Sequence, residues 1–170
     1  MVGQRSFTRR QALSAAGAAA AGVLVATAGS ARADGTQEIV GSWFATVTAT
    51  DPPLGSFASL LSFHDDGILT ESRRLFLADS PFGPLLETGG HGAWKRTGVG
   101  SYDAFFRFLL QQAPPSDGAP VGMDDVTLQL EIKSRTGVMT GNFSSTIKGT
   151  DGQAIFSASG TVVGERVEVK

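Results

Sequence analysis

Hydrophobic and polar residues alternate along most of the chain after residue 38, with the period of two that predicts β-strands. In residues 125–134, for example, Val126, Leu128 and Leu130 alternate with polar residues. Eight segments of this kind, separated by turn residues, cover 39–50, 56–63, 67–75, 91–97, 101–111, 125–134, 137–148 and 153–164. Because none of the chain after residue 34 has a long helical period, we expect an all-β fold.

The connections between these segments alternate in length. Three tight connections contain the glycine that hairpin turns favour, at 64–67, 98–100 and 134–137. Three longer connections contain proline, at 51–55, 76–90 and 112–124. Alternate connections of an antiparallel meander lie at the same end, so tight turns gather at one end and long loops at the other. Closing the eight strands into an up-and-down barrel removes two unpaired edges, and we therefore expect such a barrel.

One face of the alternation is apolar and places small residues beside large ones. An eight-stranded barrel is filled by side chains or holds one small ligand, and both outcomes stay open at this point. If the interior has space, we expect a ligand to be lined by Trp43, Phe57, Leu61, Phe63, Phe106, Phe108, Leu128, Leu130 and Phe143. The apolar connection 76–90 would then either cap the core or gate the entrance.

Residues 1–33 differ from the rest of the chain and have the three regions of an export signal. A basic start is followed by an apolar run from Ala15 to Ala28, and Ala31-Arg32-Ala33 offers a signal peptidase the small residues that it cleaves after. Within the basic region, Thr8-Arg9-Arg10-Gln11-Ala12-Leu13 resembles the bacterial twin-arginine signal. We therefore expect a cleaved signal peptide over 1–33 and a secreted or periplasmic barrel domain over 34–170, with no stable membrane insertion of the mature domain.

Composition excludes several classes of function. The 170 residues include no cysteine, which rules out disulfides, thiolate metal sites and a cysteine nucleophile. The formal net charge is −2, and it becomes −6 when Arg5, Arg9, Arg10 and Arg32 leave with the signal peptide, so nucleic acid is not an expected partner. Phosphate-binding loops, nucleophile elbows and His-x-x-x-His pairs are missing, so we expect neither a metal nor a cofactor.

Gly41-Ser42-Trp43 on the first expected strand resembles the opening of the calycin superfamily, and especially of the lipocalins. The resemblance implies an eight-stranded barrel in which a late arginine lies across the tryptophan, and Arg166 is the counterpart here. It also implies an open mouth ringed by the longer loops and a small apolar ligand inside. The chain is similar in size to allene oxide cyclase barrels, dirigent barrels and small bacterial barrel cyclases, which implies catalysis as an alternative.

Four residues are candidates for polar chemistry. Glu71 and Arg73 share one face of the third expected strand, where they form either a functional pair inside the barrel or a pair on its surface. His91 follows the long third connection and is either a mouth residue or an exposed loop residue. Tyr102, the only tyrosine, shares a face with apolar residues and is either a hydrogen-bond donor to a ligand or part of the wall. His64-Asp65-Asp66-Gly67 is best explained as a hairpin turn.

These observations predict a monomeric or weakly dimeric barrel that binds a small hydrophobic molecule. The alternative is a barrel cyclase or isomerase that confines a flexible hydrophobic substrate. In that alternative, Glu71, Arg73, His91 or Tyr102 would handle a proton or a carbonyl group. A third possibility is a protein-binding barrel that acts through its loops and has a packed interior. A charged side chain facing the interior would favour the enzyme.

Overall fold

The structure is a computed structural model of the chain. It describes residues 38–73, 76–77, 83–114, 117–133 and 136–168, so the expected signal peptide lies outside the described residues. The described residues contain ten strands and no helix: β1 Gly41–Asp51, β2 Gly55–Phe63, β3 Ile68–Arg73, β4 Phe76–Leu77, β5 Leu85–Glu87, β6 Gly90–Gly98, β7 Ser101–Gln112, β8 Pro120–Lys133, β9 Val138–Gly149 and β10 Ala154–Arg166. Nothing in this part of the chain is therefore a helix of the length and hydropathy needed to cross a bilayer.

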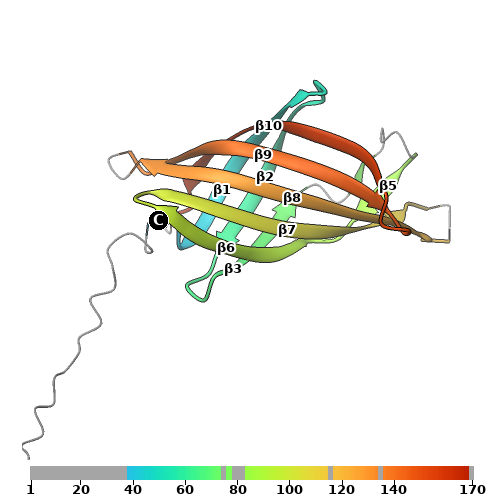
Figure 1. Ribbon diagram of the computed structural model, residues 1–170, viewed down its shortest axis with the longest axis horizontal. Coiled ribbons are helices and arrows are strands. Elements are labelled where there is room, and N and C mark those ends of the chain that lie inside the picture. Colours follow the sequence, from blue (N-terminus) through green and yellow to red (C-terminus); the bar gives the residue numbers. More distant parts are fainter. Residues whose placement is uncertain (1–37, 74–75, 78–82, 115–116, 134–135, 169–170) are drawn as a thin grey trace, which may run out of the picture. The chain divides into compact units, whose positions relative to one another are not determined.

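Eight of the strands form a closed antiparallel barrel (Figure 1). Its order is β6-β3-β2-β1-β10-β9-β8-β7, and pairing of β7 with β6 closes the ring. The expected up-and-down barrel is thus confirmed, and each of the eight expected strands corresponds to one strand of the barrel. The tight turns also form as expected, with Gly67, Gly100 and Gly137 at positive φ of 85°, 69° and 62°.

Two short strands in the third connection were not expected from the sequence. β4 pairs with β5, and β5 continues the sheet along the last residues of β7, where Leu85 lies opposite Gln112. Leu85 is fully buried. Part of the segment expected to cap or gate the barrel is therefore hydrogen-bonded into the wall, whereas residues 78–82 lie outside the described part.

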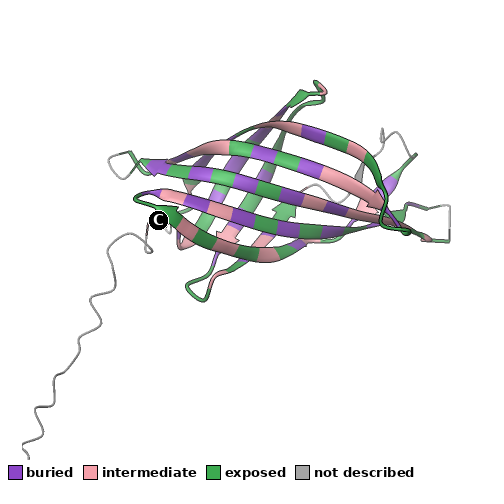
Figure 2. Ribbon diagram, viewed as in Figure 1, coloured by how far each residue is buried: buried purple, intermediate pink, exposed green. Residues whose placement is uncertain are grey.

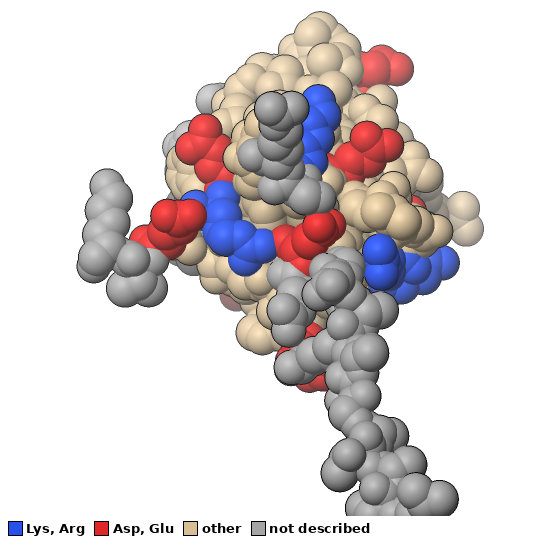
Figure 3. Space-filling view, turned by 90° about the vertical axis from the view of Figure 1, so that its left-hand side faces the viewer, with Lys and Arg blue, Asp and Glu red and all other residues tan. Residues whose placement is uncertain are grey.

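The barrel has two different ends. We call the end with connections 64–67, 99–100 and 134–137 the turn end, and the opposite end, reached by the last residues of β1, β3, β7 and β9, the loop end. Figure 2 shows the burial of successive residues alternating along the strands, as expected for a wall with one face inward. On the turn end, which faces the viewer in Figure 3, Lys and Arg side chains lie near Asp and Glu side chains.

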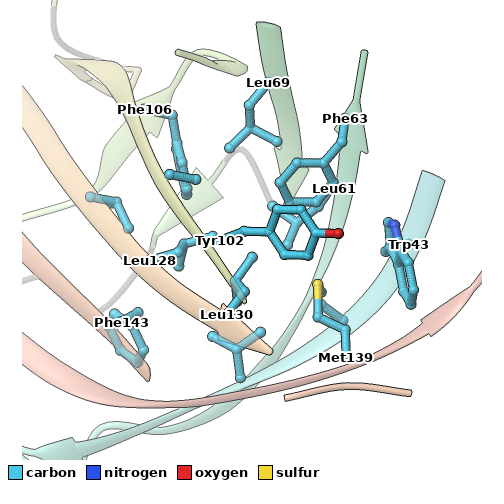
Figure 4. Packing of buried hydrophobic residues seen from close by; sticks show 14 of the residues in the cluster. Trp43, Leu61, Phe63, Leu69, Tyr102, Phe106, Leu128, Leu130, Met139 and Phe143 are labelled. Carbon is cyan, nitrogen blue, oxygen red and sulfur yellow. The ribbon is translucent and has the colours of Figure 1, made fainter. Parts of the chain in front are cut away.

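Apolar side chains fill the half of the interior next to the turn end. Figure 4 shows Trp43, Tyr102 and Met139 close to one another, and each of them is at most 1% exposed. Other members of this packed group are Ile39, Phe63, Leu69, Leu130, Ile132 and Val162. Close packing of this kind leaves no room for a ligand among these side chains.

The Gly-x-Trp segment closes the turn end. Trp43 donates from Nε1 to the carbonyl oxygen of Ile39 at 2.8 Å, and the Arg166 guanidinium lies 4.6 Å from the Trp43 ring centre. Arg166 also donates to the carbonyl oxygens of Val40 and Glu38. Gly41 has a φ of 128°, and a Cβ there would lie 2.7 Å from Arg166 Nη1. The expected contact between Arg166 and Trp43 is confirmed, and the positive φ of Gly41 explains why glycine begins the segment.

Candidate functional site

The half of the interior next to the loop end contains polar side chains. Among the described residues, the buried polar or charged ones are Ser59, Glu71, Glu87, Asp124 and Ser145. β-Sheet register explains their direction, since directly opposed residues share a face. Leu61 lies opposite Glu71, and Ser59 lies opposite Arg73. Pairing with the inward face of β2 therefore turns Glu71 and Arg73 of β3 into the interior, which is one of the two directions expected for them. The expected ion pair between the two does not form among the described residues, because Arg73 binds Glu87 and Asp124 and Glu71 binds Ser59.

Arg73 holds two carboxylates together. Its Nε and Nη2 donate to the two oxygens of Glu87, each at 2.8 Å, and Nη2 also reaches Asp124 Oδ2 at 3.1 Å. Ser145 donates to the other Asp124 oxygen at 2.6 Å. Burial lowers the pKa of Arg73, but the hydrogen bonds and charge of Glu87, together with Asp124, outweigh it and raise the pKa above its usual value. Arg73 is therefore a permanent cation that links β3 to β5 and β8.

Aromatic rings surround this cation. The Arg73 guanidinium carbon lies 4.1 Å from the Phe108 ring centre and 5.4 Å from that of Phe57. Phe57 lies opposite the inward Val47, yet it is 36% exposed. Phe57 thus lies between the polar cluster and solvent at the loop end.

Glu71 is the unusual member of the cluster. Its Oε1 accepts a hydrogen bond from Ser59 at 2.5 Å, whereas Oε2 is buried and has no hydrogen-bond partner among the described residues. Burial, with smaller contributions from the nearby charges of Glu87 and Asp124, raises the pKa of Glu71 to about 7 against the opposing effects of Arg73 and Ser59. Near neutral pH, both the acid and the carboxylate form of Glu71 are therefore populated.

The remaining candidates lie elsewhere. Tyr102 is in the packed half, six residues before Phe108 along β7 and hence about 20 Å from that level of the wall. Its ring makes an edge contact with Trp94, and burial raises the pKa of its hydroxyl. His91 is exposed on the outer face of β6, opposite Arg107. Neither residue belongs to the cluster around Arg73.

Most residues expected to line a ligand do face the interior. Eight are buried: Trp43, Leu61, Phe63, Phe106, Phe108, Leu128, Leu130 and Phe143. Phe108 belongs to the polar half because it contacts Arg73, whereas Trp43 and Leu130 belong to the packed half. A ligand role for any of them stays a prediction.

Sequence reasoning missed Glu87 and Asp124. Asp124 continues the inward alternation of Val126 and Leu128, so starting the expected strand at 125 concealed it. Glu87 was assigned to a loop, and its inward direction depends on the three-residue strand β5. Ser145 lies within the expected strand 137–148, and nothing in the sequence indicates that it donates to Asp124.

Other features of the described residues are weaker candidates for a functional site. A depression of about 630 Å³ opens on the outer wall of β6–β9, where outward residues such as Lys95, Gln129 and Asn142 line it. Groups of three or more His, Asp or Glu side chains able to hold a metal ion are not found among the residues that the structure describes. The cluster around Arg73 is therefore the candidate site.

Comparisons with known proteins add little to this geometry. No family model matches the sequence, and no curated protein matches it. A solved structure described as a redesigned β-barrel aligns with 79% of this chain and 96% of its own, at 20% sequence identity and a TM-score of 0.41.

Proposed function

We propose that this chain is an exported, lipocalin-like barrel that binds a small, mainly apolar molecule in the loop-end half of its interior. The observation that carries the proposal is the buried, unpartnered Glu71 oxygen inside a barrel whose interior is otherwise mainly apolar. A buried polar atom without a partner costs about 1–3 kcal/mol, and such costs are characteristic of functional sites. Residues 1–33 support export, since they have the regions of a twin-arginine signal.

The surroundings of Glu71 suit a mixed ligand. Phe57 and Phe108 supply aromatic surface, and Val126 and Phe143 continue the apolar wall on β8 and β9. Small-molecule sites commonly combine such apolar walls with a few convergent polar groups. A molecule entering at the loop end reaches the polar cluster after displacing Phe57, so the cluster would fix its orientation.

Native mass spectrometry of the protein expressed from the full-length gene and purified after export tests this proposal. The expected result is a bound molecule of small mass that denaturation releases. A hydrophobic fluorescent probe is expected to compete with this molecule for the same site. A protein that carries no molecule and also fails to enhance the probe's fluorescence contradicts the proposal.

A second candidate is a cyclase or isomerase acting on a flexible hydrophobic substrate. The placement of Glu71 and Arg73 inside the barrel favours it, as does the raised pKa of Glu71, which suits proton exchange near neutral pH. In this function Glu71 exchanges a proton with the bound molecule while Arg73 and its carboxylates keep the wall in place. Incubation of the released molecule with wild-type protein and with Glu71→Gln tests it: an isomer of equal mass is expected from the wild type alone.

A further inference from the structure

The unpartnered oxygen of Glu71 indicates which chemical group a ligand presents. Oε2 accepts no hydrogen bond from the described residues, although Oε1 of the same carboxyl is bound by Ser59. Glu71 is only 4% exposed, so bulk water does not solvate it freely. A partner that donates a hydrogen bond to Oε2 would remove the cost of this arrangement.

The charges around Glu71 narrow the choice of donor. Arg73 on the same strand is positive, while Glu87 on β5 and Asp124 on β8 are negative. The residues next to Glu71 on β2 and β6 are uncharged, namely Ser59 and Gly90, and the apolar Phe108 of β7 lies against Gly90. Three carboxyl groups thus share one cation. A ligand carboxylate would add a further negative charge, whereas a positively charged donor would balance one.

We propose, on the basis of the ligand-binding function above, that the ligand carries a protonated amino group, which donates to Glu71 Oε2. The apolar part of the ligand lies against Phe108 and the neighbouring wall, and the amino group converts Glu71 fully to its carboxylate. Entry requires rotation of Phe57, which lies at the solvent side of Arg73. A hydrophobic amine is therefore preferred over an alcohol, and an alcohol over a carboxylic acid, of the same chain length.

Decylamine, decanol and decanoic acid form a matched set of probes for this preference. Calorimetric titration of the protein expressed from the full-length gene and purified after export is expected to give a Kd for decylamine at least about tenfold below that for decanol, as a charge-assisted hydrogen bond implies. Decanoic acid is expected to bind weakest. In Glu71→Gln the advantage of decylamine over decanol is expected to vanish, while Glu131→Gln, which removes an exposed carboxylate from the outer wall, is expected to keep it.

A pH series on the wild-type protein provides a test that needs no variant. Alkylamines stay protonated well above neutral pH, so only the protein changes charge over this range. Decylamine affinity is expected to fall by about tenfold or more between about pH 8 and about pH 5.5, where Glu71 takes up its proton, while decanol affinity stays level.

The outcomes separate this inference from the function on which it rests. Equal affinity for decylamine and decanol, or tighter binding of decanoic acid, overturns the amine preference but leaves ligand binding in place. Failure of all three probes, together with an empty protein in native mass spectrometry, overturns both. An amine preference that persists in Glu71→Gln overturns the role of Glu71.

Discussion

The two halves of the barrel interior are built on the same strands but follow different physical rules. Toward the turn end, Trp43, Tyr102 and Met139 are almost completely buried and packed against one another. Toward the loop end, the same inward face carries Glu71, Arg73 and their carboxylate and serine partners. Apolar packing accounts for the burial in the first half. The second half buries charged side chains at a cost in stability, so the features that stabilise the fold and those of the candidate site are separated along the barrel axis.

Removing the largest side chain of the packed half should have the largest effect. Trp43→Ala is expected to lower the free energy of unfolding by about 3–5 kcal/mol, because it leaves a cavity among rigid neighbours. Urea denaturation measures the loss. Phe44→Ala, on the next residue but 53% exposed on the outer wall, is the matched control and is expected to cost less than about 1 kcal/mol. Equal losses in the two variants would contradict a solid turn-end half.

Glu71 should make the loop-end half sensitive to pH. Its pKa is about 7 in the fold against an ordinary value of 4.5 for a solvated glutamate, so the folded state holds the proton over a range in which the unfolded chain releases it. Stability contributed by this group is therefore full below about pH 4.5, falls as pH rises, and levels off above about pH 7, with a total loss of about 3 kcal/mol.

Comparison of the wild type with Glu71→Gln by urea denaturation across this range isolates that contribution. The variant is expected to be more stable than the wild type at about pH 8, with the difference shrinking toward about pH 4.5. Glu131→Gln controls for the general loss of a carboxylate. A wild-type and a Glu71→Gln curve that run parallel with pH would show that Glu71 titrates normally.

The buried ion pair between Arg73 and Glu87 should contribute more to the stability of the fold than an ion pair on the surface. Glu87→Gln is expected to destabilise the fold by about 2 kcal/mol, since it weakens two charge-assisted hydrogen bonds to a shielded guanidinium. Asp103→Asn removes an exposed ion pair, in which Lys95 Nζ and Asp103 Oδ2 are 3.8 Å apart. This variant should lower the free energy of unfolding by less than about 0.5 kcal/mol. Thermal or urea unfolding measures both, and similar small losses would argue against a structural tie at Arg73.

The smallest expected effect is at the turn end. Arg166→Gln removes the cation over Trp43 and weakens the hydrogen bonds to Val40 and Glu38, for a loss of about 1 kcal/mol. Near-ultraviolet circular dichroism should report the change around Trp43, and ligand binding at the loop end should be unaffected. Loss of probe binding in this variant would mean that the two halves are coupled.

The sequence predicts the barrel well because the wall obeys a period of two. Val126, Leu128 and Leu130 mark one face unambiguously, and glycines such as Gly67 and Gly137 mark the turns. It predicts the site less well, since the neighbours of Glu71 along the chain are also polar and both faces of the expected strand 67–75 carry charge. The register with β2 decides between them.

The rest of the site depends on contacts that no local pattern encodes. Glu87 faces inward only because β5, a strand of three residues, pairs with the end of β7. Asp124 joins it from β8, more than thirty residues later in the chain. These two carboxylates meet at Arg73 only because the sheet closes into a barrel. The sequence alone therefore does not predict the contact, because it depends on the pairing of strands that are far apart in the chain.

Arg73 has one more consequence for how the barrel works. In the order of the ring, β3 and β8 are separated by two strands on one side and four on the other, and Arg73 joins them through Asp124 across the lumen while it also holds β5 through Glu87. Its side chain therefore connects opposite parts of the barrel wall near the loop end. Glu71 lies two residues closer to the turn end than Arg73 on β3, so a ligand that reached Glu71 from the loop end, as proposed, would pass the side chain that ties these strands together. The depth of its entry would then depend on the rigidity of the loop end.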